Sequence, residues 1–340
     1  MKINLAIIGA GRIGHVHAEA INKNINANLI YIYDTNNSVA NKFASKFNCK
    51  IADINSIKND KNIDAVVICS PTNTHIDLIK NFSRAKKAIF CEKPIDLNIK
   101  KVKRCLTVIE KNNTDFMIGF NRRFDPHFLS LKKSIEEGEI GDVEILILTS
   151  RDPGLPPVQY LENSGGLFKD MTIHDFDMAA FLLGELPTEI YSTASVLVDQ
   201  KLKNINDYDT ASLILNTKSG KQIIINNSRR ASYGYDQRIE VHGSKGMISA
   251  ENQRPVSIEI ATSKGFTKPP LHHFFMTRYI QAYENELDHF IQSLMHNSNI
   301  HPNGHDGLNA LIIAEAAYSS LKSGKKNIYQ IYLIIQEHYQ

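Results

Sequence analysis

Two acidic side chains and a histidine recur at helical spacing near the middle of the chain. In the segment Gly165–Gly184, GGLFKDMTIHDFDMAAFLLG, one continuous helix would place Asp170, His174 and Asp177 at positions i, i+4 and i+7 of one face. The segment is otherwise largely apolar, so such a helix is buried and its polar stripe faces a cleft or a partner. A carboxylate one helical turn from an imidazole is suited to moving a proton.

The same residues also admit a purely structural interpretation. Asp170 could cap a helix or interact with its N-terminal dipole, and His174 could be a core histidine with its hydrogen bonds satisfied. This segment alone does not decide between proton transfer and packing.

A second candidate site begins at a glycine-rich turn near the start of the chain. Residues 3–8, INLAII, have the composition of a buried parallel strand, and GAGRIG follows directly before a predicted helix. The next predicted strand, LIYIYD, ends in Asp34, about twenty residues past the last glycine. This order of strand, glycine turn, helix, strand and acidic residue is typical of dinucleotide-binding units.

Each glycine of this turn has its own task in such a unit. Gly9 permits the tight turn, Gly11 lets the backbone approach a pyrophosphate, and Gly14 lets the helix pack on the strand. The free N–H groups and the positive dipole end of the helix bind phosphate. The expected cofactor contacts at this turn are Gly9, Gly11, Arg12, Ile13 and Gly14.

Asp34 bears on which dinucleotide binds. Its carboxylate can accept hydrogen bonds from a ribose 2′-hydroxyl, whereas a 2′-phosphate would meet a like charge. The next residues, Thr35, Asn36 and Asn37, provide no cation for that phosphate. The sequence therefore predicts NAD rather than NADP.

Polar side chains also follow two further predicted strands, at 64–69 and 88–91. Ligands of open parallel sheets bind at the carboxyl ends of the strands, so these residues are placed to contact a cofactor. For His75, a surface position at a helix start is an equal alternative. Lysines are mostly solvated, but Lys93 lies between a buried strand and a proline. The expected contacts are Ser70, Pro71, Thr72, Asn73, His75, Glu92 and Lys93.

The pattern of elements predicts an α/β protein of two domains. Residues 1–121 alternate strands and helices, as in a doubly wound parallel sheet. Residues 122–340 predict an α+β domain on an open, largely antiparallel sheet. Its predicted strands are 143–150, 188–198, 208–217, 222–231 and 236–242, and its predicted helices are 126–137, 278–296 and 305–322.

The predicted strands around Ile214 and Ile224 have apolar residues on both faces. One face can be covered by helices, while the other would remain an exposed apolar patch unless a second subunit covers it. The sequence therefore predicts a homodimer or homotetramer formed through this sheet.

Composition excludes several classes of partner. The net charge of +3 over 340 residues, without a lysine or arginine run, gives no basis for nucleic acid or membrane binding. The N-terminus leads directly into a strand, which does not fit a signal peptide. The four cysteines, Cys49, Cys69, Cys91 and Cys105, have no metal-ligand spacing and fit a reduced, cytoplasmic protein without a metal.

Taken in order, five motifs resemble the glucose–fructose oxidoreductase and inositol dehydrogenase family over nearly the whole chain. They are GAGRIG with Asp34, SPTNTH, CEKP, GFNRRFDP and SGGLFKDMTIHDFDMA. The SRDPGLPP and DMTIHDFD stretches resemble its inositol 2-dehydrogenase branch. The resemblance implies a Rossmann domain, NAD, a second α/β domain whose open sheet is used in assembly, and oxidation of a cyclic polyol, most closely myo-inositol to 2-keto-myo-inositol.

The resemblance also implies roles for individual residues. The catalytic set of the family maps onto Lys93, Asp170 and His174, which must all reach one nicotinamide ring. His174 is then the general base, Asp170 orients it or binds a neighbouring hydroxyl, and Lys93 stabilises the developing alkoxide. These three residues would also bind the substrate, together with Arg122, Asp177 and Tyr235.

Some positions depart from the family or vary within it. Ala180 stands where related sequences often have arginine, and Asn121 and Ser150 lie at positions that vary between branches. Two alternatives therefore stay open. The first is a dehydrogenase of the same family for another sugar, scyllo-inositol or a nucleotide sugar. The second is an NAD-bound regulator without turnover, which gains nothing from a base beside a cation.

Overall fold

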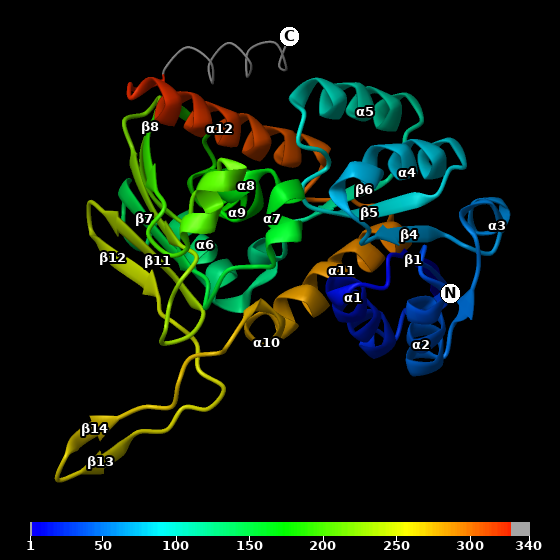
Figure 1. Ribbon diagram of the computed structural model, residues 1–340, viewed down its shortest axis with the longest axis horizontal. Helices are drawn as coiled ribbons and strands as arrows, with labels where there is room; N and C mark the ends of the chain where they lie inside the picture. Colours follow the sequence, from blue (N-terminus) through cyan, green and yellow to red (C-terminus); the bar gives the residue numbers. More distant parts are fainter. Residues whose placement is uncertain (1, 328–340) are drawn as a thin grey trace. The chain divides into compact units, whose positions relative to one another are not determined.

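The first α/β stretch forms a six-stranded parallel sheet in the computed structural model, which describes residues 2–327 (Figure 1). The strand order is β3-β2-β1-β4-β5-β6, so the direction of winding reverses between β1 and β4. Every neighbouring pair is parallel, as predicted. The strands are β1 Ile3–Ile8, β2 Ala27–Tyr33, β3 Lys50–Ile51, β4 Ala65–Ile68, β5 Ala88–Glu92 and β6 Phe116–Gly119.

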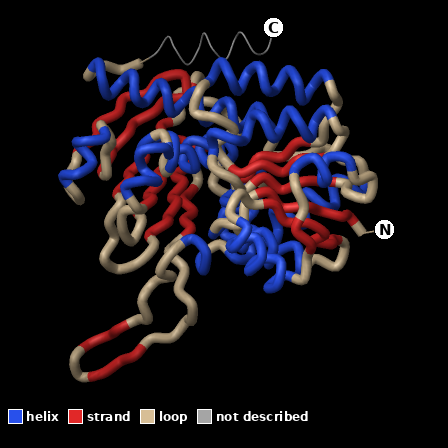
Figure 2. The backbone as a smooth tube through the Cα atoms, turned by 45° about the vertical axis from the view of Figure 1, so that its right-hand side comes forward, coloured by secondary structure: helices blue, strands red, loops and turns tan. Residues whose placement is uncertain are grey.

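Helices cover both faces of this sheet (Figure 2). They are α1 Arg12–Lys23, α2 Asn37–Phe47, α3 Ile54–Asn59, α4 Thr72–Arg84 and α5 Ile99–Lys111, followed by the short helix η1 Asn121–Phe124. Strands β4 and β6 are buried along their whole length, which explains their continuous apolar sequences. The short elements β3 and α3 had no counterpart in the sequence prediction.

A helix from the end of the chain belongs to the same compact unit, which comprises Met1–Asp125 and Ile280–Leu311. Helix α11, Ile280–His296, packs on α1 and places Leu287, Phe290 and Ile291 in the core of the parallel sheet. Asn24 also donates a 2.8 Å hydrogen bond to Asp288. The sequence prediction grouped this helix with residues 122–340, because an apolar helical face does not reveal which sheet it covers.

The second unit comprises Pro126–Tyr279 and the segment that starts at Ile312. Its sheet has the order β12-β11-β7-β10-β9-β8, in which only β7 and β10 pair in parallel. The prediction of a largely antiparallel sheet is thus confirmed. The strands are β7 Val143–Arg151, β8 Pro187–Ser195, β9 Thr210–Thr217, β10 Gln222–Ser228, β11 Asp236–Gly243 and β12 Gly246–Ala250.

The two faces of this second sheet differ in exposure. Alternate residues such as Leu213, Leu215 and Ile223 are buried, because side chains on a strand point to opposite faces in turn. On the other face Ile214 is 52% exposed and its cross-strand neighbour Ile224 is 36% exposed. The apolar residues predicted on both faces are therefore present. The helices of this unit are α6 Pro126–Glu136, α7 Val158–Ser164, α8 Gly166–Asp170, α9 Ile173–Leu183, η2 Gln200–Ile205, α10 Phe275–Arg278 and most of α12 Gly304–Ser323.

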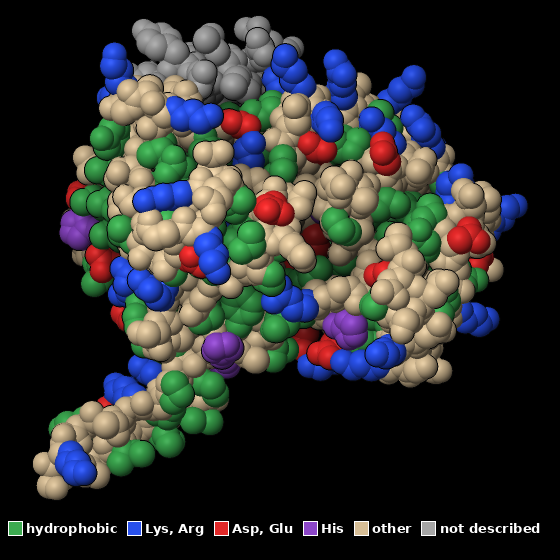
Figure 3. Space-filling view, in the orientation of Figure 1, with side chains coloured by type: hydrophobic (Ala, Val, Ile, Leu, Met, Phe, Trp, Pro, Cys, Tyr) green, Lys and Arg blue, Asp and Glu red, His purple; other side chains and the backbone are tan. Residues whose placement is uncertain are grey.

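An arm extends from the second unit beyond β12 (Figure 1). It ends in a hairpin of β13, Ile260–Thr262, and β14, Gly265–Thr267, which pair only with each other. Figure 3 shows hydrophobic side chains along this arm, where Val256, Ile258 and Phe266 are exposed. The sequence prediction contained neither this hairpin nor β12.

The segment Gly165–Gly184 is not one continuous helix. Helix α8 ends at Asp170 and α9 begins at Ile173, and Met171 and Thr172 interrupt the helix between them. Thr172 donates a 2.6 Å hydrogen bond from its hydroxyl to Asn227 of the sheet. Asp170 and His174 therefore belong to two separate helices.

Candidate active site

The glycine turn of the first unit is shaped by close backbone approach. A Cβ atom on Gly14 would lie 2.2 Å from the carbonyl oxygen of Gly9, which no real side chain tolerates. Gly9 itself has φ +108°, and its Cβ would lie 2.8 Å from the backbone of Ser70. By contrast, a Cβ on Gly11 would meet nothing within 4 Å. The turn is therefore closed toward the sheet and open at Gly11.

Helix α1 starts directly after this opening and carries no side-chain cap. The N–H groups of its first turn lack partners within the helix, so they can bind an anion. Arg12 is exposed at this helix start and Ile13 is half-buried. These features fit the pyrophosphate of a dinucleotide.

Asp34 lies beside this turn. Its Oδ2 accepts a 2.8 Å hydrogen bond from the N–H of Ala10, and its Oδ1 accepts one of 2.8 Å from the N–H of Asn36. Each carboxylate oxygen has a second lone pair, which leaves capacity for ribose hydroxyls. Asp34 therefore also stabilises the glycine turn, a task that the sequence did not reveal.

His75 holds two loops together at the carboxyl edge of the sheet. It is buried, and its ring nitrogens lie 2.9 Å from the carbonyl oxygen of Pro94 and 2.8 Å from that of Ser70. Burial lowers the pKa of this imidazole, and the two carbonyl groups oppose the effect only in part. The structure thus places His75 beneath the loops that follow β4 and β5.

The other residues of this edge differ in exposure. The hydroxyl of Ser70 lies 2.6 Å from that of Thr74, and Pro71 and Asn73 are exposed while Thr72 is half-buried. The peptide bond between Lys93 and Pro94 is cis.

A buried histidine that the sequence analysis did not single out supports Glu92. The Nε2 of His17 lies 2.7 Å from Oε1 of Glu92, whose Oε2 accepts a 3.3 Å hydrogen bond from the N–H of Lys93. His17 lies on the buried face of α1 and contacts the ring of Phe90. The sequence feature that could have identified His17 is its position about one helical turn after Gly14.

In the second unit, Asp170 is held by two donors. Its Oδ1 accepts a 2.7 Å hydrogen bond from the hydroxyl of Tyr160, and its Oδ2 accepts one of 3.1 Å from the guanidinium of Arg229. Neither donor was predicted: Tyr160 lies 10 positions and Arg229 lies 59 positions from Asp170 in the sequence. Asp170 is not an N-terminal helix cap, because it is the last residue of α8 and Thr172 is the N-cap of α9.

Helix α9, which carries His174 and Asp177, is fastened to the sheet by the residue between them. Asp175 is fully buried and accepts hydrogen bonds of 2.6 Å from the Ser150 hydroxyl and 2.7 Å from the Asn227 amide. Both partners end neighbouring strands, β7 and β10, where they lie opposite each other. The start of α9 therefore has a fixed position on the sheet. Asp177 is buried one turn further along.

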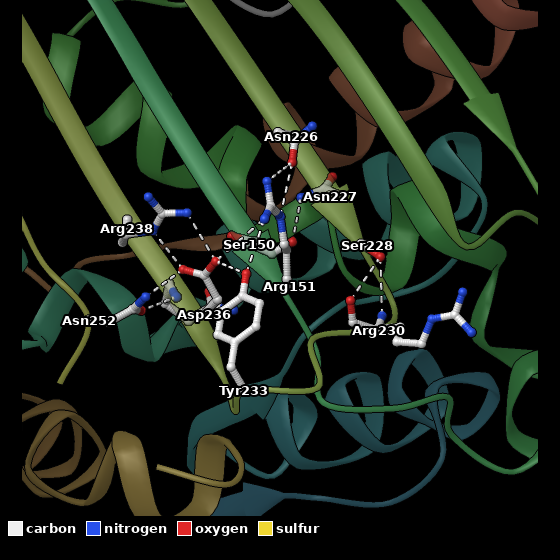
Figure 4. Close-up of polar contacts among 11 residues, drawn as sticks. Ser150, Arg151, Asn226, Asn227, Ser228, Arg230, Tyr233, Asp236, Arg238 and Asn252 are labelled. Atoms are coloured by element: carbon white, nitrogen blue, oxygen red, sulfur yellow. Dashed lines mark hydrogen bonds and ion pairs between the residues drawn. The ribbon is translucent and has the colours of Figure 1, made fainter. Parts of the chain in front are cut away.

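The segment that precedes β11 is fixed by a polar cluster on Asp236 (Figure 4). This buried carboxylate accepts hydrogen bonds from Tyr233 at 2.6 Å, Asn252 at 2.6 Å and Arg238 at 2.7 Å. Burial raises the pKa of Asp236, but these donors outweigh it and the pKa lies below its usual value. Tyr235, between Tyr233 and Asp236 in sequence, is buried beside Phe274.

The structure thus brings together some predicted residues and leaves others apart. Gly9, Gly14, Asp34 and Ser70 surround one turn in the first unit. Lys93 and Arg122 also belong to that unit, and Arg122 is buried in η1. Asp170, His174, Asp177 and Tyr235 belong to the second unit. Within residues 2–327, no three His, Cys, Asp or Glu side chains are grouped to hold a metal ion.

Two family models match the chain. The first, described as an oxidoreductase family with an NAD-binding Rossmann fold, matches residues 3–120. The second, described as the C-terminal alpha/beta domain of an oxidoreductase family, matches residues 132–329.

Individual relatives are similar over almost their full length. The chain is 56% identical to an inositol 2-dehydrogenase of Rhizobium meliloti, covering 94% of this chain and 97% of the relative. It is 42% identical to a myo-inositol 2-dehydrogenase of Thermotoga maritima, over 94% and 96% of the two chains. The crystal structure of a myo-inositol dehydrogenase from Corynebacterium glutamicum is similar with a TM-score of 0.92 and 39% identity, over 96% of this chain and 98% of that chain. The chain therefore belongs to the Gfo/Idh/MocA family of oxidoreductases, with an NAD-binding Rossmann domain and a C-terminal alpha/beta domain.

Proposed function

We propose that this protein oxidises myo-inositol to 2-keto-myo-inositol with NAD. The observation that carries the proposal is the anchoring of Asp170 and of α9, which bears His174, in a chain that also has a complete dinucleotide turn. A binding protein needs the turn but has no use for a clamped carboxylate near an imidazole. The relatives named for inositol oxidation support the choice of substrate.

The reaction needs a proton acceptor and a stabiliser of charge. When bound, NAD accepts a hydride at its nicotinamide ring. His174 takes the proton of the reacting hydroxyl, because an alcohol is too weak an acid to lose it unaided. Lys93 donates a hydrogen bond to the oxygen and stabilises the negative charge that develops there. Asp170 keeps the imidazole of His174 in the orientation for this transfer.

Further residues are proposed to recognise the two ligands. Arg122, Asp177 and Tyr235 bind substrate hydroxyls, since a polyol needs many polar partners in a small cleft. The cofactor-binding residues are Gly9, Gly11, Arg12, Ile13, Gly14, Asp34, Ser70, Pro71, Thr72, Asn73, His75, Glu92 and Lys93. Residues 1–121 then hold the cofactor, and residues 122–340 hold the substrate and the assembly surface.

A substrate panel tests this proposal directly. The purified protein is assayed with myo-inositol, scyllo-inositol, glucose and a nucleotide sugar, each with NAD, by following the absorbance of NADH. We expect the highest kcat/KM for myo-inositol. A higher value for another polyol would assign the chain to a different substrate of the same family. Binding of NAD without turnover of any polyol would identify a regulator.

Asp34 provides a test of cofactor choice. Asp34→Ala removes the acceptor for the ribose hydroxyls and the charge that repels a 2′-phosphate. We expect NAD affinity to fall roughly tenfold or more, the cost of hydrogen bonds to a charged group, while discrimination against NADP is relaxed. Titration calorimetry with both dinucleotides measures the effect.

Asp53→Ala is the matched control for this change. Asp53 is also an aspartate of the first unit that accepts backbone and hydroxyl hydrogen bonds, but it caps α3 instead of facing the glycine turn. Its replacement leaves both dinucleotide affinities unchanged. An unaltered preference for NAD in Asp34→Ala would show that Asp34 does not select the cofactor.

The open face of the second sheet supports a homodimer or homotetramer. Ile214 is an exposed neighbour of both Tyr191 and Ile224 across the strands, which makes a continuous apolar stripe. We expect Ile214→Asp to shift the protein toward monomers in light scattering, because a second copy would bury that charge. Lys218→Asp, an exposed change in the turn after β9, is the control. A wild-type monomer at micromolar concentration would contradict this assembly.

The thiols support a cytoplasmic location. The structure shows Cys49, Cys69, Cys91 and Cys105 as free cysteines. Burial raises the pKa of Cys49 to about 11 and that of Cys105 to about 11, so both stay protonated and unreactive. No helix in the described part of the chain is long and apolar enough to cross a membrane.

A further inference from the structure

Arg229 is a charged side chain enclosed in the second unit. It follows the last residue of β10 and is 1% exposed. Its backbone N–H donates a 2.8 Å hydrogen bond to the carbonyl oxygen of Asp209, which fixes where the side chain starts. A fully buried guanidinium costs several kcal/mol unless carboxylates compensate it.

Three carboxylates compensate this charge. Burial lowers the pKa of Arg229, but the negative charges of Asp170, Asp152 and Asp207 outweigh that effect and the pKa is raised. Of these three, Asp170 is the one that Arg229 contacts in a hydrogen-bonded ion pair, at 3.1 Å. Asp207 instead accepts a 2.8 Å hydrogen bond from the N–H of Leu167 in α8.

Asp170 is held from two sides as a result. The hydroxyl of Tyr160 on α7 binds one carboxylate oxygen and the guanidinium of Arg229 binds the other. A carboxylate with a donor on each oxygen cannot rotate without breaking one of these hydrogen bonds. Asp170 is the last residue of α8, so these two hydrogen bonds hold its side chain at the point where the helix is interrupted.

We propose that Arg229 is a positioning residue for the reaction: it keeps the Asp170 carboxylate ionised and fixed, so that Asp170 can orient His174 for proton transfer. Tyr160 completes this clamp from the opposite side. The catalytic part of this inference rests on the proposed function, whereas the protonation of Asp170 can be measured without turnover.

The charged and polar groups around Asp170 determine how a substitution there changes the protonation of its carboxylate. Tyr160 of α7 and Arg229 after β10 contact Asp170, Asp207 adds a like charge, and His174 follows four positions later in the sequence. Lys169 and Glu315, on α8 and α12, form an ion pair with each other at 2.5 Å. Arg229 is a cation in direct contact with Asp170, and its removal makes the carboxylate easier to protonate.

The experiment compares Arg229→Gln, Arg229→Lys and Tyr160→Phe with wild type. A carbon NMR titration of the aspartate carboxylates follows Asp170, whose signal is identified by its loss in Asp170→Asn. In Arg229→Gln we expect Asp170 to take up its proton about one pH unit or more above wild type. Arg229→Lys restores most of this change, since it retains the charge, and Tyr160→Phe gives a smaller change in the same direction.

Kinetics with NAD and myo-inositol form the second measurement. We expect Arg229→Gln to lower kcat at least about tenfold while KM for NAD stays within about twofold, because orientation of the base affects only the chemical step. Arg230→Gln is the control, since its exposed side chain contacts the carbonyl oxygen of Leu197 instead of Asp170 and its backbone N–H binds Ser228 (Figure 4). It keeps both wild-type values.

Two results would overturn the inference. One is a titration of Asp170 that is unchanged in folded Arg229→Gln. The other is a decrease in kcat that is fully explained by a smaller fraction of folded protein. If Arg229→Gln does not fold, Arg229→Lys and Tyr160→Phe decide by the same criteria. Absence of turnover in wild type would contradict the proposed function, and the titration would still test the clamp.

Discussion

His174→Ala is expected to lower kcat for myo-inositol oxidation by about 100- to 10,000-fold, the usual contribution of a positioned general base. In the proposed mechanism the imidazole takes the hydroxyl proton, and alanine provides no replacement. NAD affinity stays within about twofold, because His174 is not among the proposed cofactor-binding residues. Initial rates and calorimetric titration with NAD separate the two effects.

Lys93→Ala is expected to lower kcat by a similar factor for a different reason. In the proposed mechanism the ammonium group stabilises the oxygen as negative charge develops, and removal of one such donor commonly costs about 100- to 1000-fold. His242→Ala serves as a control for loss of an imidazole, since His242 is exposed and pairs with Glu144 at 3.4 Å on β7. Wild-type turnover in His174→Ala or Lys93→Ala would remove that residue from the mechanism.

The parts of the fold that local sequence decides were predictable. A buried parallel strand needs only a short apolar run, and a tight turn needs glycine, so β1, the turn at Gly9 and α1 follow from residues 3–23 alone. The second sheet was equally predictable, because its strands alternate and are joined by recognisable turns.

The break between α8 and α9 depends on contacts that sequence spacing does not contain. Thr172 lies in the interruption between the two helices, and its hydroxyl binds Asn227, 55 positions later in the sequence. Asp170 and His174 therefore have the spacing of a pair on one helix, although they belong to two helices.

The supporting residues of the site were hidden for the same reason. His17 and Glu92 are 75 positions apart, and Asp170 and Arg229 are 59 positions apart. In a sequence, a buried lysine, arginine or histidine cannot be distinguished from an exposed one. The motifs therefore suggested candidate ligand-binding residues and missed the residues that hydrogen-bond to them.

The glycine turn gives the second large expected effect. Gly14→Ala places a methyl group 2.2 Å from the backbone oxygen of Gly9, which no side-chain rotation can relieve. Helix α1 must then move off β1, at a cost of about 1 to 3 kcal/mol or more. We expect a lower Tm in the absence of cofactor, measured by thermal unfolding, and loss of NAD binding as a consequence.

Gly11→Ala is the matched change with the opposite pattern. The backbone of Gly11 is extended, at φ −73°, and an added Cβ would meet nothing within 4 Å, so the Tm without cofactor stays at its wild-type value. The methyl group instead occupies the space through which a pyrophosphate approaches the backbone, and NAD affinity falls at least about tenfold.

Equal NAD affinity in Gly11→Ala and wild type would mean that the phosphates bind elsewhere. An unchanged Tm in Gly14→Ala would contradict the packing of α1 on the Gly9 carbonyl group. Because the turn is closed at Gly14 and open at Gly11, the first substitution changes stability and the second changes cofactor binding alone.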